Sequence, residues 1–226
     1  MARWGQTMFF GSRILYFPGC YSKYKLKDIA SNYAKILSKL GIKFEIANEE
    51  ACCGSPLFNA GYQLDFQDIK NKNLEIFRSK KIDKIVTNCP SCYRVFIKLY
   101  GLKTEHITQT LAKHLKKIPV KYEEEITYFD PCNLGRKSGI YEEPRLILES
   151  LGFDVKEMPQ NRANGLCCGA CGGLKENLPG LANKIAKEVL SKCKTKKLIT
   201  CCPLCYLHLK ENAKEVQVLE LSQVLI

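Results

Sequence analysis

The sequence predicts an α/β fold made of two related halves, each a small parallel sheet flanked by helices. Three observations predict this fold. Short apolar stretches alternate with longer amphipathic ones, which is the pattern of strands and helices in alternation. The pattern of the first half recurs after roughly 110 residues, which indicates a duplicated unit. The same repeat relates a lone cysteine, a Cys-Cys-Gly motif and a Cys-Pro-x-Cys motif in the two halves.

In the first half, apolar residues at 14–17 predict a buried strand that stops at Pro18-Gly19. Helical spacing then runs to Leu40, and Gly41 occupies the left-handed position that commonly ends a helix. The later elements follow by the same criteria. They are a strand over 42–46, a helix over 62–78, a strand over 85–87, a helix over 90–100 that begins at Pro90, and a short strand and helix within 105–115, with Thr108 as the helix cap.

The second half follows the same order, with 126–129 in the place of 14–17 and Gly152 in the place of Gly41. We therefore expect one domain over 13–122 and a second over 123–226, with the seam near 121–125. Alternating strands and helices predict right-handed crossovers and parallel sheets, in which ligands bind beyond the carboxyl ends of the strands.

Each half places its cysteines just after its strands, so all five sulfurs are expected at one edge of the sheet. Ten of the 13 cysteines fall into these two sets. The first set is Cys20, Cys52, Cys53, Cys89 and Cys92, and the second is Cys132, Cys167, Cys168, Cys202 and Cys205.

Composition narrows the class of protein. The 226 residues are 46% hydrophobic, which is enough for a substantial core. No secretory leader and no apolar run of about 18 residues is apparent, so we expect a cytoplasmic protein without a membrane span. In a reducing compartment, 13 cysteines indicate metal binding or redox chemistry rather than structural disulfides. The net charge of +12 comes from scattered lysines, which argues against nucleic-acid binding.

Residue types and spacing favour an iron–sulfur cluster. Cys89 and Cys92 stand on the first turn of a predicted helix, where the helix dipole stabilises thiolates, the form that binds metals. Cys52 and Cys53 are adjacent, so their side chains diverge and suit two different irons. Zinc takes four ligands and would leave one of five sulfurs unused. An iron–sulfur cluster therefore ranks first, while zinc and a disulfide relay remain open.

The spacing of these motifs resembles the CCG domain of the B-type subunits of heterodisulfide reductases and of related iron–sulfur oxidoreductases. The segments that carry the resemblance are Phe-Pro-Gly-Cys at 17–20, Cys-Cys-Gly-Ser-Pro at 52–56, Asp-Pro-Cys-Asn-Leu-Gly-Arg at 130–136 and Cys-Cys-Gly-Ala at 167–170. The resemblance covers 14–226. It implies tandem CCG domains, each holding a noncubane [4Fe-4S] cluster through its five cysteines, with zinc as an alternative at one site.

The resemblance also implies a role. The expected function is a redox subunit that reduces or forms a disulfide, inactive without partner subunits such as a ferredoxin-like iron–sulfur protein or a flavoprotein, and cytoplasmic or peripheral to a membrane complex. One alternative is an electron-transfer module of a lactate, glycolate or glycerol-3-phosphate dehydrogenase complex acting on a 2-hydroxyacid-related substrate. Another is a zinc-stabilised scaffold without redox activity. No nucleotide-binding glycine motif follows a strand, so electrons are expected to come from a partner.

Three polar residues near the second set are the predicted catalytic residues, namely Asp130, Asn133 and Arg136. Because the equivalent first-half stretch has Pro18 in place of Asp130, the second site is the expected reaction centre. Asn133 departs from the histidine usual in the family, and Cys171 departs from a glycine. The remaining cysteines are expected not to be ligands: Cys171 as a bystander, Cys193 as a buried structural thiol and Cys201 as the last residue of a strand.

Overall fold

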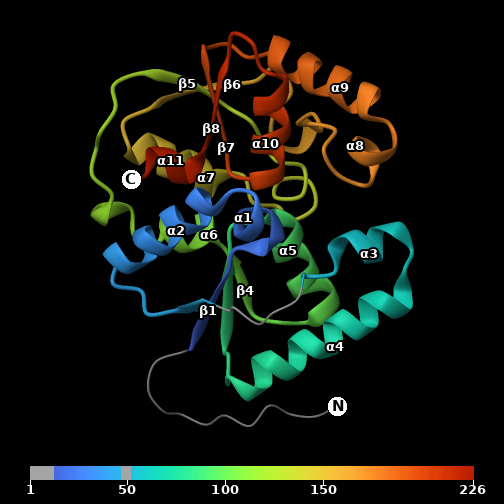
Figure 1. Ribbon diagram of the computed structural model, residues 1–226. Helices are drawn as coiled ribbons and strands as arrows, with labels where there is room; N and C mark the ends of the chain where they lie inside the picture. The colour runs from blue at the N-terminus through green and yellow to red at the C-terminus, as the bar shows by residue number, and fades with distance from the viewer. Residues whose placement is uncertain (1–12, 47–51) are drawn as a thin grey trace.

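The structure, a computed structural model, describes residues 13–46 and 52–226. In these residues eight strands form two four-stranded sheets, one in each half of the chain, and all strand pairs are parallel (Figure 1). The first sheet contains β1 (Ile14–Phe17), β2 (Glu45–Ile46), β3 (Lys84–Thr87) and β4 (Thr104–His106) in the order β2-β1-β3-β4. The second contains β5 (Glu125–Tyr128), β6 (Asp154–Glu157), β7 (Lys197–Thr200) and β8 (Gln217–Glu220) in the order β6-β5-β7-β8. The predicted fold class is confirmed.

Helices connect these strands and cover both faces of each sheet. The first half has α1 (Gly19–Tyr24), α2 (Lys27–Lys39), α3 (Ser55–Ala60), α4 (Gln63–Ser79), α5 (Pro90–Val95), the π-helix η1 (Phe96–Tyr100), α6 (Ile107–Ala112) and the 3-10 helix η2 (Leu115–Lys117). The second half has α7 (Glu142–Ser150), the 3-10 helix η3 (Arg162–Asn164), α8 (Leu174–Asn177), α9 (Pro179–Ser191), α10 (Pro203–Asn212) and α11 (Leu221–Val224).

The strand order decides where the cysteines meet. β1 and β3 are neighbours at the centre of the first sheet, and the chain leaves them toward opposite sides, so their carboxyl ends form a switch point. β5 and β7 have the same relation in the second sheet. The lone cysteine follows the first strand of each pair and the Cys-Pro-x-Cys motif follows the second. Both motifs therefore lie at one edge of the sheet.

The residues that begin and end the helices agree with the prediction, except at the start of α6. Gly41 (φ 76°) and Gly101 (φ 70°) have the left-handed conformation that ends α2 and η1. The predicted cap of α6 is wrong, because α6 begins one residue after His106 and the His106 side chain accepts the Thr108 N–H. Gln109 completes this capping box, and Gln223 completes the equivalent box at Glu220.

Other differences from the predicted elements lie around the Cys-Cys-Gly motifs. The predicted strand over 42–46 pairs only through Glu45 and Ile46, and residues 47–51 lie outside the described part. Cys167 does not follow β6 directly, because η3 lies between them. The short helices α3 and α8 after the two motifs were not predicted, since each is too short to show a helical period.

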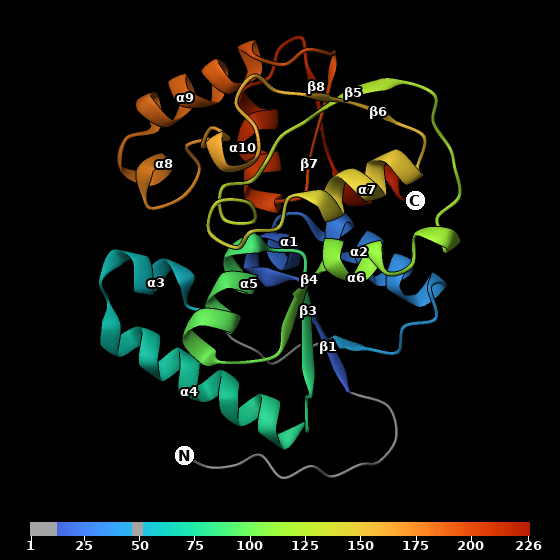
Figure 2. The ribbon, with the colours of Figure 1, turned by 180° about the vertical axis from the view of Figure 1, so that it is seen from behind.

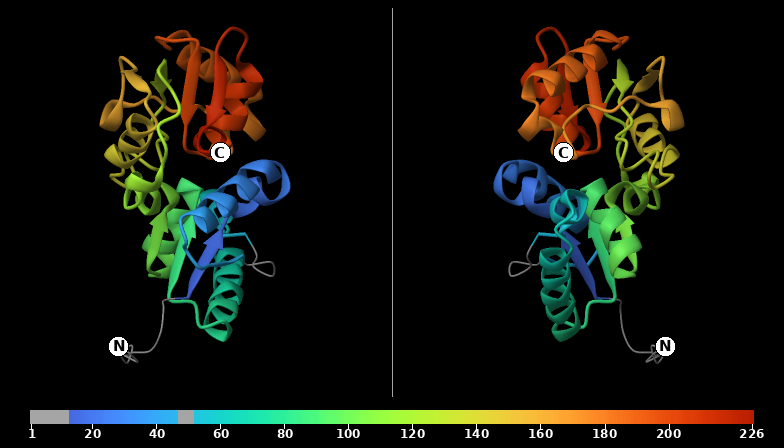
Figure 3. Two further views of the ribbon diagram at one scale, coloured as in Figure 1. Left: turned by 90° about the vertical axis from the view of Figure 1, so that its left-hand side faces the viewer. Right: turned by 90° about the vertical axis from the view of Figure 1, so that its right-hand side faces the viewer.

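The two halves pack against each other through helices. Figure 2 shows α6 of the first half beside α7 of the second, α2 packs against α11, and Figure 3 shows the second half stacked on the first. The larger hydrophobic core is continuous across this interface and includes Tyr33 and Ile107 from the first half and Ile126 and Leu221 from the second. A buried hydrogen bond of 2.7 Å from the Tyr33 hydroxyl to Glu220 Oε1 also joins the halves.

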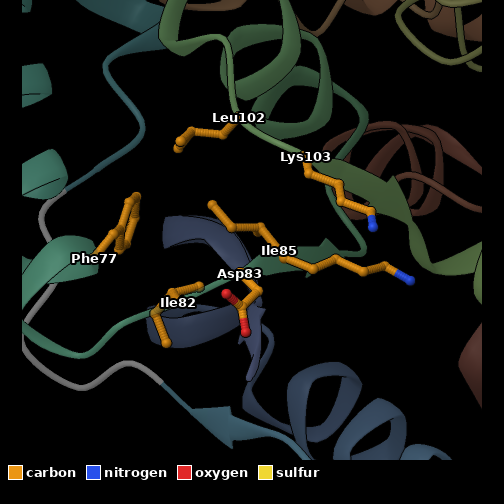
Figure 4. A pocket seen from close by; sticks show the side chains of 7 residues that line it. Phe77, Ile82, Asp83, Ile85, Leu102 and Lys103 are labelled. Carbon is orange, nitrogen blue, oxygen red and sulfur yellow. The ribbon is translucent and has the colours of Figure 1, made fainter. Parts of the chain in front are cut away.

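A small cavity lies at the other end of the first sheet, where β3 begins (Figure 4). Its volume of about 20 Å³ has room for a single water molecule rather than for a substrate. Its walls come from Phe77, Ile82, Asp83, Lys84, Ile85, Leu102 and Lys103. The cysteines lie past the carboxyl end of β3, so this cavity is separate from them.

Candidate metal centres

The five first-half cysteines gather in one place through a chain of sulfur contacts. The Cys20 thiol on α1 interacts with that of Cys52, and the Cys52 thiol with that of Cys53. The Cys53 and Cys92 sulfurs are 3.3 Å apart, and the Cys92 thiol also interacts with that of Cys89 at the start of α5. The first predicted ligand set is therefore brought together.

The second half repeats this chain of contacts member for member. The Cys132 thiol interacts with that of Cys167, and the Cys167 thiol with that of Cys168. The Cys168 and Cys205 sulfurs are 3.3 Å apart, and the Cys205 thiol also interacts with that of Cys202 at the start of α10. The second predicted ligand set is also brought together.

Glycine is required beside the sulfurs. Gly54 (φ 83°) and Gly169 (φ 85°) both adopt the left-handed conformation after the paired cysteines. A Cβ on Gly54 would lie 2.6 Å from the Phe66 ring, and one on Gly169 would lie 3.1 Å from the Ala182 carbonyl oxygen. These glycines let α4 and α9 pack directly on the Cys-Cys-Gly turns.

Hydrogen bonds favour the thiolate form of the first cysteine in each Cys-Cys-Gly motif. The pKa of Cys52 falls to about 3, because the Cys20 and Cys53 thiols and backbone N–H groups donate to it. The pKa of Cys167 falls to about 2 for the corresponding reasons, with the Arg136 charge adding to the effect. The donor thiols Cys20 and Cys132 have raised pKa values as a result. Thiolate is the form that binds iron or zinc.

The donor set fits a cluster better than a single ion. Within the described residues, no three His, Cys, Asp or Glu side chains are arranged to hold one metal ion. The sulfurs form two chains of five instead, and no carboxylate or imidazole enters either chain. One zinc ion would use four ligands, whereas an iron–sulfur cluster takes thiolates on several irons.

Asp130, predicted as catalytic, is engaged within the protein. Its side chain is buried, and Arg145 donates to both carboxylate oxygens at 2.9 and 2.8 Å. The Arg162 backbone N–H donates to the same carboxylate at 2.8 Å. With these donors in place, Asp130 holds the Cys132 loop against the Arg162 segment, which precedes Cys167.

Arg145 is the centre of this polar network. It also pairs with Glu157 at 2.6 Å, and its guanidinium lies 4.9 Å from the centre of the Tyr128 ring. Burial alone would lower its pKa, but the hydrogen bonds to Glu157 and Asp130 outweigh burial and raise it.

Asn133 lies between the two cysteine groups. Its Nδ2 donates to Ser91 Oγ at 3.1 Å, and Ser91 stands between Cys89 and Cys92. The same atom is 3.9 Å from Cys171 Sγ. Asn133 is 8% exposed, and its Oδ1 has no hydrogen-bond partner. Asn133 thus links the loop of one site to that of the other and keeps an acceptor available.

Arg136 is exposed, and its guanidinium donates to the Gly165 carbonyl oxygen at 2.6 Å. This contact ties the Cys132 loop to the residues just before Cys167. Because its charge also helps to lower the Cys167 pKa, Arg136 lies close to the second group of sulfurs. An exposed guanidinium at this position is accessible to an anion.

The sequence did not predict the buried contacts that tyrosines of the central strands make near the two cysteine groups. Tyr16 donates to Asn88 Oδ1 at 2.9 Å, whereas Tyr128 lies 3.0 Å from Cys201 Sγ. Cys201 is buried one residue past the end of β7. Cys193 is half-buried after α9, and its Sγ is 4.0 Å from the Val189 carbonyl oxygen. Alignment of the two halves pairs Asn88 with Cys201. This alignment could have indicated the contact between Tyr16 and Asn88.

Comparisons with known proteins agree with this geometry. The CCG family, described as Cysteine-rich domain, matches twice, at 14–97 and 126–210. An uncharacterized iron-sulfur protein of Methanocaldococcus jannaschii is 33% identical over 89% of this chain and 42% of its own length. A fumarate reductase (CoM/CoB) subunit of Methanothermobacter marburgensis is 33% identical over 91% of this chain and 43% of its own. A dihydromethanophenazine:CoB–CoM heterodisulfide reductase subunit of Methanosarcina mazei is 32% identical over 91% and 55%.

The chain thus spans about half the length of these curated relatives. No helix among the described residues is long and apolar enough to cross a membrane. Two family matches coincide with two parallel sheets, and each carries one complete group of five cysteines. The chain therefore belongs to the CCG family of cysteine-rich domains and contains two of these domains in tandem.

Proposed function

We propose that this chain is the iron–sulfur redox subunit of a heterodisulfide reductase-like oxidoreductase and takes part in the reduction or formation of a disulfide. The observation that carries the proposal is the gathering of five sulfurs in each domain by one repeated pattern of contacts. The relatives include an iron-sulfur protein and a heterodisulfide reductase subunit, which supports the same chemistry.

Each group of five cysteines would hold one noncubane [4Fe-4S] cluster. The ligands would be Cys20, Cys52, Cys53, Cys89 and Cys92 in the first domain and Cys132, Cys167, Cys168, Cys202 and Cys205 in the second. A bound cluster would supply one-electron steps beside a disulfide. Around it the protein would bind and orient the substrate and keep the thiolates in place.

We propose the second domain as the reaction centre. Arg136 offers an exposed guanidinium beside Cys167, and Asn133 offers a buried acceptor without a partner. Asp130 would act as a positioning residue, because both of its oxygens are held by Arg145 and Arg162. The first domain has Pro18 in the place of Asp130 and no equivalent ionic network among the described residues.

Electrons would arrive from a partner subunit. The net charge of +12 suits an acidic ferredoxin-like protein or flavoprotein, with association that weakens as salt rises. The relatives are about twice as long as this chain, so the rest of their length is a natural place for such a partner function.

A second function is an electron-transfer module of a different dehydrogenase or reductase complex, of the lactate, glycolate or glycerol-3-phosphate type. The observation that favours it is the fumarate reductase relative, whose name gives another overall reaction at the same identity. A zinc-stabilised scaffold is less consistent with five sulfurs in each group, because one ion would leave a sulfur unused.

Metal analysis tests the class of function. The purified chain, prepared without oxygen, should contain iron and acid-labile sulfide in both domains. Zinc without sulfide would reject the redox proposal.

Paired variants test the reaction centre. Cys20→Ser and Cys132→Ser should both stay folded, and with the native partner present Cys132→Ser should abolish disulfide turnover. Loss of turnover in Cys20→Ser with turnover retained in Cys132→Ser would reject the second domain as the reaction centre.

A further inference from the structure

A groove of about 520 Å³ lies beside Cys167 in the second domain. One wall is the segment that ends in the Cys-Cys-Gly motif, and the other is one face of α9, which is drawn in orange in Figure 1. The lining residues are Leu166, Cys167, Lys184, Ile185, Glu188 and Val189. The groove is open to solvent along its length, and most of its lining surface is apolar.

The first domain has the same helix in the same place. α4 packs on Gly54 as α9 packs on Gly169, and the nearest side chains come from Phe66 in one case and from Ile185 in the other. α4 starts at Gln63 and α9 at Pro179, so the two helices align from their first residues. In this alignment Phe66 corresponds to Ala182 and Asn73 to Val189.

In the first domain both of these residues, Phe66 and Asn73, fix α4 to its surroundings. The Phe66 ring packs edge-on against Phe58 and Tyr100, with ring centres 5.2 and 6.2 Å apart. Asn73 Nδ2 donates to the Cys52 carbonyl oxygen at 3.0 Å, which ties α4 to the cysteine turn. Ala182 and Val189 have neither a ring nor an amide and cannot make these contacts in the second domain, where Ala182 is buried and Val189 lines the groove.

The chemistry of the groove indicates the class of its ligand. Leu166, Ile185 and Val189 make its walls apolar. Glu188 is paired with Lys192 at 3.1 Å, so its charge is compensated. Lys184 is exposed and has no ion-pair partner in the described residues. The groove thus combines an apolar surface with one uncompensated positive charge.

We infer that this groove binds a small amphipathic anion, with its apolar body against Leu166, Ile185 and Val189 and its anionic group on Lys184. The ligand would then lie against Cys167, on the side of the cysteine group that α9 faces. The role of this ligand as a substrate at the redox site rests on the proposed function. Binding itself depends on the groove.

A chain-length series tests the apolar wall. We expect butanoate, hexanoate and octanoate to bind the purified holoprotein with affinity that rises about fourfold for each added methylene, as measured by isothermal titration calorimetry. Octylamine, which has the opposite charge and the same apolar body, should bind more weakly than octanoate. Affinity that does not depend on chain length would overturn the inference.

Variants on α9 test the position of the site. Ile185→Trp should fill the groove and weaken octanoate binding about tenfold. Lys184→Glu should weaken it about threefold to fivefold, the size expected for an exposed ion pair, without weakening octylamine. Lys187→Glu makes the same charge change on the same helix outside the groove and should leave the affinity unchanged. An equal loss in Lys187→Glu would show that only the general positive charge attracts the anion.

Iron and acid-labile sulfide are measured in every variant, which separates the two proposals. Binding with this pattern in a protein without iron would reject the redox function and support the groove. A full complement of iron with no such pattern would support the redox function and reject the groove.

Discussion

The two domains arrange their cysteines in the same way, but the buried polar side chains behind the cysteines differ. We call these side chains the polar support of each site. In the first domain the strand that leads to Cys20 carries Tyr16, whose hydroxyl donates to Asn88, and Asn88 donates to Ser22 at 2.9 Å. In the second domain Tyr128 contacts Cys201 and lies under the guanidinium of Arg145. One support is neutral and the other is ionic.

This difference shows which features the sulfur arrangement requires. Both supports give the same five-membered chain of sulfur contacts, so neither the ion pairs nor Asn88 is needed for it. The parallel strand ends, the left-handed glycine and the helix that starts within Cys-Pro-x-Cys are common to both domains. The polar supports differ while the sulfur arrangement does not, so differences in chemistry between the two sites can arise from the supports.

The largest expected effect comes from removing one sulfur. Cys168→Ser should lower the iron content by about half, because one of two sites loses a ligand. Cys53→Ser should have the same effect in the first domain. Cys171→Gly should retain the iron, since Cys171 lies outside the chain of sulfur contacts and the first domain has Pro56 at the equivalent position. Iron loss in Cys171→Gly equal to that in Cys168→Ser would show that the second ligand set is wrong.

Breaking the ionic support should cost stability only in the second domain. Arg145→Met leaves the buried Asp130 carboxylate without its main partner and should lower the free energy of unfolding by about 3–5 kcal/mol. Urea denaturation measures this loss. Arg162→Met is the matched control, because its side chain is 42% exposed and its pairs should contribute at most about 1 kcal/mol. The double variant Asp130→Asn with Arg145→Met should recover part of the loss, and no recovery would contradict the assigned pair.

The equivalent caps His106 and Glu220 should give opposite dependences on pH. Burial raises the pKa of Glu220 to about 7 from its ordinary value of 4.5, so only the unfolded chain is ionised between these values. Stability should fall as pH rises through this window, by at most about 3 kcal/mol. Burial lowers the pKa of His106 to about 3 from 6.5, so its contribution should rise with pH over that window.

Denaturation of Glu220→Gln and His106→Gln at several pH values tests this contrast. Glu220→Gln should remove the decrease in stability between about pH 5 and 7, and His106→Gln should remove the increase below about pH 6.5. Unchanged profiles in both variants would mean that neither group titrates as its surroundings predict.

The smallest expected effect concerns the link between the two sites. In a double-mutant cycle, Asn133→Ala and Ser91→Ala should show a coupling of about 0.5–1.5 kcal/mol, the value of one hydrogen bond. A cycle of Tyr21→Phe with Ser91→Ala serves as the control, since no hydrogen bond joins that pair among the described contacts. Coupling of equal size in both cycles would argue against a specific Asn133–Ser91 bond.

The fold was predictable because its signals are local and occur twice. Ile14–Phe17 and the helix before Gly41 show their periodicity directly, and the repeat at 126–129 reinforces the assignment. The parallel order of the strands followed from the alternation of strands and helices. The gathering of the two sets of sulfurs also followed, because the motifs stand at strand ends.

The contacts between distant side chains were not predictable. Nothing in the sequence pairs Asn133 with Ser91 or Tyr33 with Glu220, because these bonds depend on how the two domains pack. The cap of α6 was assigned to Thr108 because threonine is a common cap, whereas His106 has the extended backbone that a cap requires. The groove beside Cys167 depends on how α9 packs against the segment before the Cys-Cys-Gly motif, and the sequence does not show this packing.

The parallel pairing of β1 with β3 also bears on how the chain folds. Ile14 pairs with Lys84 and Phe17 with Thr87, so the centre of the first sheet cannot form until a long intervening segment has been synthesised and closed. Pairings of this kind slow folding, and the apolar β1 stays without its central neighbour in the meantime. During synthesis this strand is the segment of the first domain that would benefit most from protection by a chaperone.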